Sequence, residues 1–301
     1  MTIEIHCGTT RALLDPERGF TLYSMVVDGF DYLHTEPGFP EHGKVTHSGI
    51  PVLFPWPNRI AGAHFAWDGS SYDVPVTEPA TGAGLHGFAC HAKWQVLNAD
   101  SDRATGEFIL SRDAPEHVTD WPADAGIRLT YLLSERSLTA RASVFSPAGE
   151  PLPFGLGFHP YLRVPGSFDQ WLLQCDATGH WPLRDMIPTG EILPLPPELD
   201  FRHPRAIGGA HLDDVLTGLP EATAISRRAA LIGPETSIEV SSDPGFGEYV
   251  LFTPGSRDAV AIEPYTCTTD AVHLGSRGGW QVLQPTEEAT FEWRIDVIAS
   301  S

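Results

Sequence analysis

The chain has 301 residues and carries 39 acidic against 19 basic side chains, a formal net charge of −20 with neutral histidines. A surface of that sign repels phosphate backbones and anionic lipid headgroups, which excludes nucleic acids and membranes as expected partners. A neutral small molecule meets no such barrier. Residues 1–11 have neither a basic leader nor an apolar run, so we expect a cytoplasmic protein without a signal peptide.

The cysteines and histidines show no metal-binding pattern. Four cysteines lie far apart, without CxxC or zinc-like spacing: Cys7, Cys90, Cys175 and Cys267. His34, His42 and His47 cluster in a stretch rich in glycine and proline, but their spacing matches no zinc motif. We therefore expect reduced thiols, no metal and no cofactor.

Period-two patterning dominates the chain. Apolar and polar residues alternate over residues 127–133, 138–144 and 291–297, which predicts half-buried strands because successive side chains of a strand point to opposite faces. Glycine (29) and proline (27) are spread along the chain, which is typical of many turns. The sequence therefore predicts one all-β domain over residues 1–301, with large antiparallel sheets.

Helical periodicity is not sustained in any segment of the sequence. We expect a few short helical turns, near residues 114–118 and 211–216. The proline-rich stretch 188–204 could pass for a linker between domains. Its apolar residues favour a loop that lies across the sheets instead.

Two glycine- and proline-rich segments come first among the candidates for chemistry. The prolines within Gly49–Ile60 exclude a regular central strand and favour a stiff loop. Arg59, held on such a loop, would present fixed donors to hydroxyl groups or to a carboxylate; a plain surface arginine is the alternative. The segment Gly84–Phe88 places His86 between glycines.

The next candidate segment is Pro153–Pro160. Its large apolar residues at even positions share one strand face, whereas Gly155, Gly157 and His159 share the other. The second face lacks side chains just before an imidazole, which would leave room for a ligand to approach the backbone. Pro160 biases His159 toward an extended conformation. A strand kink with a structural histidine is the alternative.

Two carboxylates complete the candidates. Asp213, in the run His211–Asp214, could accept hydrogen bonds from hydroxyl groups or cap a short helix. Glu263 follows Ala259 and Ala261 on one strand face, which predicts a titratable group at a strand end beyond small residues. A solvated charge at the sheet rim is the alternative for Glu263.

Together these segments resemble the aldose 1-epimerase (galactose mutarotase-like) family, in the family's order, from about Gly49 to Asp270. The most specific matches are the Phe-Pro-x-x-Asn-Arg-Ile run ending at Ile60, Leu85-His86-Gly87 followed by Trp94, Gly157-Phe158-His159-Pro160-Tyr161, the Leu212-Asp213 pair and Ile262-Glu263-Pro264. The resemblance implies a β-supersandwich fold with an open sugar cleft on its concave face.

The resemblance also implies the site. Glu263 would be the base on the anomeric hydroxyl and His159 the acid at the ring oxygen of a free aldose. Arg59, His86 and Asp213 would bind the sugar hydroxyls, with His86 close enough to assist proton transfer. This implies a mutarotase that acts on a monosaccharide without a cofactor. Its oligomeric state, monomer or homodimer, stays open.

The match departs from the galactose enzymes at several positions. Phe88 replaces a second glycine after Leu-His-Gly, and Tyr265 stands where a Glu-x-Gln pattern is usual. The run at 159–162 is closer to the broader bacterial epimerase-like branch, so galactose is not implied as the substrate. Tyr265 or Trp56 could stack on the apolar face of a pyranose, with core packing as the alternative.

Three alternative functions stay open. A hexose-6-phosphate 1-epimerase would need several cationic donors in the cleft, and the sequence offers Arg59 with Lys44 and Lys93. A non-catalytic sugar-binding protein would have no use for a matched acid and base. A glycosidase would require Glu263 and Asp213 as its carboxylate pair.

Overall fold

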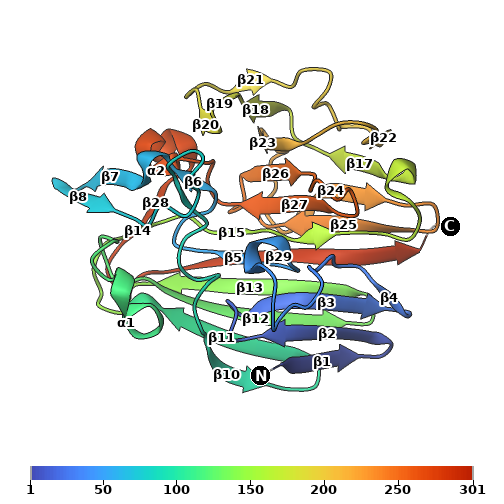
Figure 1. Ribbon diagram of the computed structural model, residues 1–301, viewed down its shortest axis with the longest axis horizontal. Coiled ribbons are helices and arrows are strands. Elements are labelled where there is room, and N and C mark those ends of the chain that lie inside the picture. The colour runs from blue at the N-terminus through green and yellow to red at the C-terminus, as the bar shows by residue number, and fades with distance from the viewer. Residues whose placement is uncertain (1, 300–301) are drawn as a thin grey trace.

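Antiparallel strands build almost all of the fold, as the sequence predicts. The computed structural model describes residues 2–299, which form three larger sheets, four two-stranded ribbons and a few short helices (Figure 1). The predicted fold class is confirmed. Within the described range, no helix is both long and apolar enough to cross a bilayer.

The largest sheet has nine strands and contains the three segments whose alternation is visible in the sequence. In order across the sheet its strands are β10 (Gln95–Ala99), β11 (Arg103–Ile109), β12 (Gly126–Ser134), β13 (Ser137–Phe145), β29 (Glu288–Ala299), β25 (Thr236–Ser242), β24 (Ser226–Ile232), β17 (Leu172–Cys175) and β22 (Arg205–Ala206). In β29, for example, Phe291, Trp293 and Ile295 are buried while Arg294 between them is exposed. The three strand predictions are confirmed.

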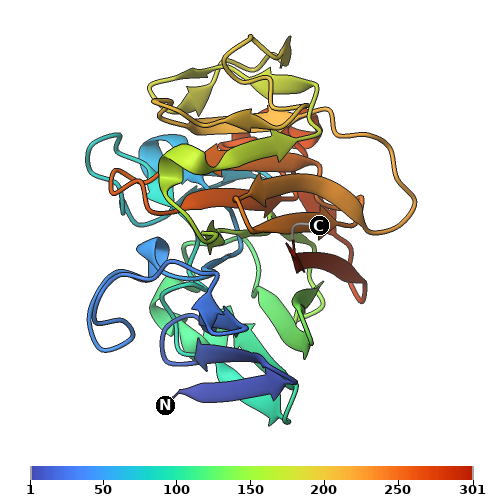
Figure 2. The same ribbon diagram turned by 90° about the vertical axis from the view of Figure 1, so that its right-hand side faces the viewer.

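A four-stranded N-terminal sheet covers part of the nine-stranded one. Its strands are β1 (Ile3–Cys7), β2 (Thr10–Asp15), β3 (Thr21–Val27) and β4 (Phe30–Asp31). β1 and β2 lie against β11 and β12, as the blue and green strands show (Figure 2). Phe20 fills the space between the layers, with ring centroids 5.6 Å from Trp94 and 5.9 Å from Tyr131.

The eight-stranded sheet carries the candidate site. In order its strands are β21 (Leu193–Pro194), β18 (Gly179–Trp181), β23 (Asp213–Thr217), β26 (Glu248–Phe252), β27 (Val260–Tyr265), β15 (Gly157–Phe158) and β5 (Val52–Leu53), while β16 (Tyr161–Leu162) also pairs with β27. β27 therefore lies between β26 on one side and β15 and β16 on the other. All six of its residues are buried.

The remaining elements are short. The ribbons pair β14 (Leu152–Phe154) with β28 (Gln281–Leu283), β19 (Leu183–Arg184) with β20 (Ile187–Pro188), β6 (Arg59–Ile60) with β9 (Gly84–Leu85), and β7 (His64–Trp67) with β8 (Ser70–Asp73). The α-helices are α1 (Leu110–Asp113) and α2 (Ala271–Leu274). The 3-10 turns are η1 (Val45–His47), η2 (Ala61–Ala63), η3 (Pro115–His117), η4 (Phe168–Gln170) and η5 (Gly275–Gly278).

Of the two predicted helical turns, one is confirmed and one is wrong. A 3-10 turn, η3, lies within residues 114–118. Residues 213–217 form strand β23, which pairs with β18 and β26. Val215 and Leu216 are both buried, in two different apolar clusters, because both faces of this strand are covered. The alternation that marks a half-buried strand is therefore lost.

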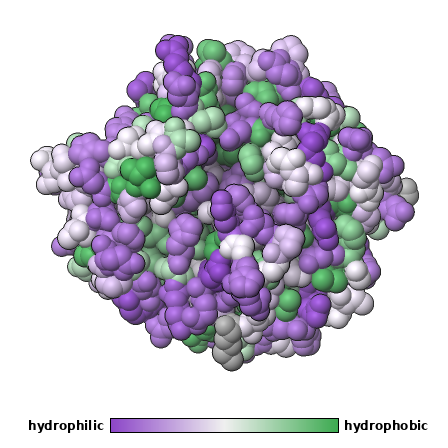
Figure 3. Space-filling view, viewed as in Figure 1, coloured by the Kyte–Doolittle hydropathy of each residue, from purple (hydrophilic) through white to green (hydrophobic). Residues whose placement is uncertain are grey.

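One continuous apolar cluster, from Ile5 to Val297, draws residues from all three larger sheets. The proline-rich stretch 188–204 adds Leu199 and Phe201 to this cluster and leaves Ile192 exposed. The single domain over residues 1–301 stays a prediction from the sequence. The face seen in Figure 3 is mostly hydrophilic, with apolar residues in small groups.

Candidate active site

Glu263 is the fourth residue of β27, and its side chain is 1% exposed. The sequence analysis expected it at a strand end, with a solvated rim charge as the alternative. Both expectations are wrong, because Glu263 lies within β27, an interior strand of the sheet whose six residues are all buried. Val250 of β26 lies directly opposite. A carboxyl group buried to this degree needs polar partners, and its two oxygens have different ones: an imidazole at ion-pair distance and a hydroxyl donor.

The first partner of Glu263 is His159, which lies between β15 and β16. Its Nε2 is 3.3 Å from Oε1 of Glu263. The imidazole stacks on the ring of Tyr161 at 4.4 Å between centroids, and the Tyr161 hydroxyl donates to the carbonyl of Thr46 at 2.7 Å. The backbone N–H of His159 donates to the carbonyl of Pro51 at 3.1 Å. These contacts hold Nε2 toward the carboxyl group.

The second partner of Glu263 is Tyr265, whose hydroxyl donates to Oε2 at 2.5 Å. The Tyr265 ring lies across Gly157, its partner in β15; a Cβ atom added at Gly157 would be 2.6 Å from Cδ1 of Tyr265 and 2.7 Å from Cβ of Pro57. The sequence analysis expected the glycine face to leave room for a ligand. That is wrong here, since Pro57 and Tyr265 fill the space.

His86 lies at a sharp turn of the segment that follows β9. His86 and Gly87 both have left-handed backbone conformations, with φ of 68° and 70°. Asn58 donates its backbone N–H to Nδ1 of His86 at 3.2 Å and accepts the His86 N–H at 2.9 Å. Nδ1 is therefore an acceptor, which leaves the imidazole proton on Nε2. The His86 and His159 rings meet edge to face, 5.6 Å apart.

Arg59 is engaged by a carboxylate that the sequence analysis did not identify. Its Nε and one terminal nitrogen each donate to Glu78 at 2.7 Å, and the other terminal nitrogen donates to Oδ1 of Asn58 at 3.0 Å. This bidentate geometry fixes the guanidinium plane and compensates its charge. Glu78 lies in a loop, and no spacing in the sequence connects it to Arg59.

Asp213 is the first residue of β23 and does not cap a helix, contrary to the alternative considered above. Burial raises the pKa of its carboxyl group, and the Arg59 guanidinium opposes that shift. Among residues 2–299, the Asp213 carboxylate has no hydrogen-bond or ion-pair partner. Its oxygens are therefore open to hydroxyl groups of a ligand.

A pocket of about 290 Å³ brings all five predicted site residues together: Arg59, His86, His159, Asp213 and Glu263. The other lining residues are Thr46, His47, Asn58, Glu78, Leu85, Tyr161, Val250, Phe252 and Tyr265. The volume is near the lower end of the range for small-molecule sites. Trp56 is absent from this lining, since it is buried against Trp121 with a centroid distance of 5.1 Å.

Burial penalises an isolated charge on either member of the Glu263–His159 pair. It lowers the pKa of His159 to about 3 and raises the pKa of Glu263 well above its usual range. A proton that moves between the two groups leaves the pair neutral overall, either as imidazolium with carboxylate or as imidazole with carboxylic acid. The arrangement can therefore take up one proton and release another without burying a net charge.

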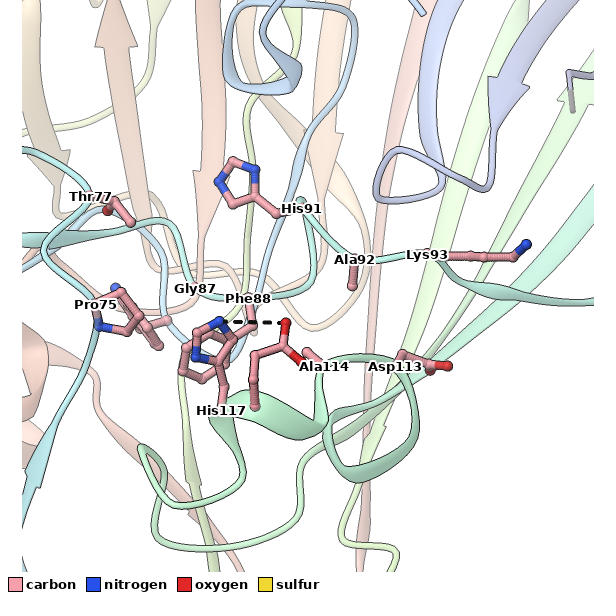
Figure 4. A pocket seen from close by; sticks show the side chains of 12 residues that line it. Pro75, Thr77, Gly87, Phe88, His91, Ala92, Lys93, Asp113, Ala114 and His117 are labelled. Carbon is pink, nitrogen blue, oxygen red and sulfur yellow. Dashed lines mark ion pairs between the residues drawn. The ribbon is translucent and has the colours of Figure 1, made fainter.

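A second pocket, of about 360 Å³, is lined by residues from 56–93 and 113–117 (Figure 4). Phe88 and His117 stack there, 4.6 Å apart, and Nε2 of His117 lies 4.0 Å from Glu116. None of the five predicted site residues lines this pocket. Although it is larger, its histidine and carboxylate are farther apart and Glu116 is 68% exposed, whereas the His159–Glu263 pair is buried, so the smaller pocket is the candidate active site.

Within residues 2–299, no group of three or more histidine, cysteine or carboxylate residues is arranged to hold a metal ion. His34 and His47 contact separate carboxylates, Asp258 at 3.3 Å and Glu36 at 2.8 Å. The four cysteines are free thiols.

Comparisons with known proteins find relatives that cover most of the chain. An uncharacterised Escherichia coli protein, YphB, is 28% identical over 265 residues, which span 85% of this chain and 86% of that protein. A galactose mutarotase-like protein from Clostridium acetobutylicum superposes with a TM-score of 0.87 at 22% identity, over 99% of this chain and 95% of that one. The GalM/aldose epimerase homologue from C. elegans gives 0.82 at 19% identity, over 100% and 99%.

At these identities the solved structures establish the fold. The sequence model of the aldose 1-epimerase family matches residues 3–296. The chain therefore belongs to the aldose 1-epimerase family.

Proposed function

We propose that this protein is a mutarotase that interconverts the α and β anomers of a free aldose. The observation that carries the proposal is the contact between Nε2 of His159 and Oε1 of Glu263, 3.3 Å apart in a pocket of about 290 Å³. Mutarotation requires one base and one acid on opposite sides of a single C–O bond. It requires no metal or nucleotide.

Ring opening uses both members of the pair and starts from its imidazolium–carboxylate form, in which one proton has moved from Oε1 of Glu263 to Nε2 of His159. The Glu263 carboxylate takes the proton of the anomeric hydroxyl, and the electron pair left on that oxygen forms the aldehyde C=O. The bond between the anomeric carbon and the ring oxygen breaks, and the His159 imidazolium gives its Nε2 proton to the ring oxygen. The pair then holds a carboxylic acid and a neutral imidazole. Rotation about the bond between C1 and C2, followed by the reverse proton transfers, yields the other anomer.

The remaining predicted residues hold the sugar. Asp213 offers free carboxylate oxygens to sugar hydroxyls, and His86 presents its Nε2 proton as a donor. Arg59 is fixed by Glu78 and Asn58, so it provides a rigid wall with directed N–H groups. The edge of His86 lies against the His159 ring, which supports an assisting role in proton transfer.

A free aldose is favoured over a hexose 6-phosphate because of charge. Among the described residues that line the pocket, Arg59 is the one lysine or arginine, and the Glu78 carboxylate compensates its charge. Lys93 is paired with Glu17 at 2.7 Å and does not line the pocket. A phosphate in this pocket would face Glu263, Asp213 and Glu78, and the guanidinium in the lining, that of Arg59, is already paired.

The test is an anomer-exchange assay by polarimetry and by two-dimensional exchange NMR, with neutral aldoses, amino sugars, sulfosugars and hexose 6-phosphates. We expect accelerated exchange of at least one neutral aldose and weak or no acceleration of glucose 6-phosphate. Methyl glycosides serve as a control, because they lack the anomeric hydroxyl and cannot open. Sugar binding without accelerated exchange would instead identify a binding protein. Preference for the phosphate would identify a hexose-6-phosphate 1-epimerase.

A further inference from the structure

The two oxygens of the Glu263 carboxyl group have different neighbours. Oε2 accepts the hydroxyl proton of Tyr265 at 2.5 Å, and both side chains are buried. Oε1 faces Nε2 of His159 at 3.3 Å. Burial raises the pKa of the Tyr265 phenol well above its usual range, so the phenol keeps its proton and acts as a donor. Hydrogen bonds from a donor to a carboxylate are short and strong.

The Tyr265 ring is held on several sides. Gly157 of β15 lies beneath it, and Glu248 of β26 is its partner on the other side of β27. Leu53 and Trp181 belong to the same buried apolar cluster as Tyr265. Because Tyr265 and Glu263 are two residues apart in one strand, their side chains project from the same face. The hydroxyl group therefore has little freedom to leave Oε2.

We propose that Tyr265 is a positioning residue, which holds Oε2 of Glu263 and leaves Oε1 as the oxygen that takes the anomeric proton. The inference rests on the proposed mutarotase function. With Oε2 occupied, the carboxyl plane is fixed, and Oε1 is the oxygen next to the imidazole that delivers the second proton. Both proton transfers then take place where Oε1 of Glu263 and Nε2 of His159 meet.

The charged groups around Glu263 define the expected pH response. Asp213 from β23 disfavours the carboxylate, and Arg59 from β6 favours it. His159 faces it from the segment that joins β15 and β16, and Tyr161 faces it from β16. The Tyr265 hydroxyl bond stabilises the carboxylate, so its loss raises the pKa of Glu263. The acidic limb of the pH–rate profile then moves to higher pH.

The experiment compares Tyr265→Phe with Tyr249→Phe. Tyr249 is also fully buried, and its hydroxyl donates to Ser242 at 2.9 Å, outside the pocket. Protein labelled with ¹³C at the glutamate carboxyl carbons is titrated by NMR, with Glu263→Gln identifying the signal. Values of kcat and KM for anomer exchange are measured across the same pH range. Circular dichroism checks that each variant is folded.

For Tyr265→Phe we expect the Glu263 titration and the acidic limb to move to higher pH together. On the acidic side kcat falls about tenfold, the effect of losing about 1.4 kcal/mol from one charge-assisted hydrogen bond, while KM changes less than about twofold. Tyr249→Phe leaves both midpoints in place. Unchanged midpoints in Tyr265→Phe, or an equal movement in Tyr249→Phe, would overturn the proposal.

A nearly isosteric substitution covers the case in which Tyr265→Phe does not fold. Tyr265→3-fluorotyrosine keeps the hydroxyl and makes it a stronger donor, so both midpoints should move to lower pH; no movement would refute the positioning role. The NMR titration needs no substrate. If the titration shifts in Tyr265→Phe but the wild type does not accelerate anomer exchange, the proposed function is overturned, and with it the role of Oε1. The hydrogen bond from Tyr265 to Oε2 would still be established.

Discussion

Two buried glutamates on neighbouring strands make an informative pair. Glu248 of β26 is 7% exposed and Glu263 of β27 is 1% exposed. Each accepts a hydrogen bond from an aromatic side chain: Glu248 from the Trp181 indole N–H at 3.1 Å, and Glu263 from the Tyr265 hydroxyl at 2.5 Å. Burial raises the pKa of both, that of Glu248 to about 8.

The difference between the two carboxyl groups lies in what else they contact. Glu263 contacts His159 and lines the pocket. Among the described residues, Glu248 has no histidine in ion-pair contact and is absent from the pocket lining. Burial and a raised pKa are therefore insufficient to identify a catalytic carboxyl group. A second titratable partner and access for a substrate are also needed. Each prediction below tests this distinction.

The largest expected effect separates the two glutamates directly. Glu263→Gln should lower kcat for anomer exchange by about 10²–10⁴-fold, because the amide cannot take the anomeric proton. Glu248→Gln should stay within about twofold of the wild type, because Glu248 lies outside the pocket. Polarimetry measures both. Equal losses in the two variants would remove the distinction.

The second effect concerns His159, the histidine that contacts Glu263. His159→Asn should lower kcat by at least about a hundredfold, since an amide cannot protonate the ring oxygen. His117→Asn, in the second pocket, is the matched control and should keep nearly wild-type exchange. Nuclear magnetic resonance of anomer exchange gives both rates. Wild-type exchange in His159→Asn would remove His159 from the mechanism.

A smaller effect is expected where the pocket binds rather than reacts. Arg59→Lys keeps the charge but loses the two parallel bonds to Glu78, so KM should rise about tenfold while kcat changes less than about threefold. Arg112→Lys is the control, because the Arg112 guanidinium is likewise held by carboxylates, those of Glu107 and Asp113, and does not line the pocket. A large loss of kcat in Arg59→Lys would place Arg59 in the chemical step.

The last effect is on the pH dependence of folding stability, through Glu248. Its pKa in the folded protein is about 8, above the ordinary 4.5. The stabilisation from the protonated carboxyl group is therefore complete below about pH 4.5 and is lost as the pH rises through about 8. Glu248→Gln should lack this loss, on the order of a few kcal/mol. Calorimetric Tm values of the wild type and Glu248→Gln should diverge between about pH 4 and about pH 9. Parallel curves would contradict the raised pKa of Glu248.

The sequence predicts strands best where one face is buried. β12, β13 and β29 have alternating patterns because their second faces meet solvent or small residues. β23 and β27 are covered on both faces, so their patterns are continuous. That is why residues 211–216 suggested a helical turn and Glu263 was expected at a strand end.

The site is predictable to the extent that its residues occur in motifs. Glu78 comes from a loop and Thr46 and His47 from the 3-10 turn η1, and tertiary packing alone brings them to the pocket. Tyr265 differs, because its position two residues after Glu263 places both on one strand face. Period-two spacing could therefore have suggested the contact. The sequence predicts open space beside Gly157, but Pro57, which is distant in sequence, packs there.

The central claim is that Glu263 and His159 act as one unit on a single C–O bond, and a double-mutant cycle tests it most directly. Anomer exchange is measured for the wild type, Glu263→Gln, His159→Asn and the double variant at one pH. If the pair is a unit, the double variant should exchange within about threefold of the slower single variant. Losses that multiply, so that each residue contributes independently, would contradict the account.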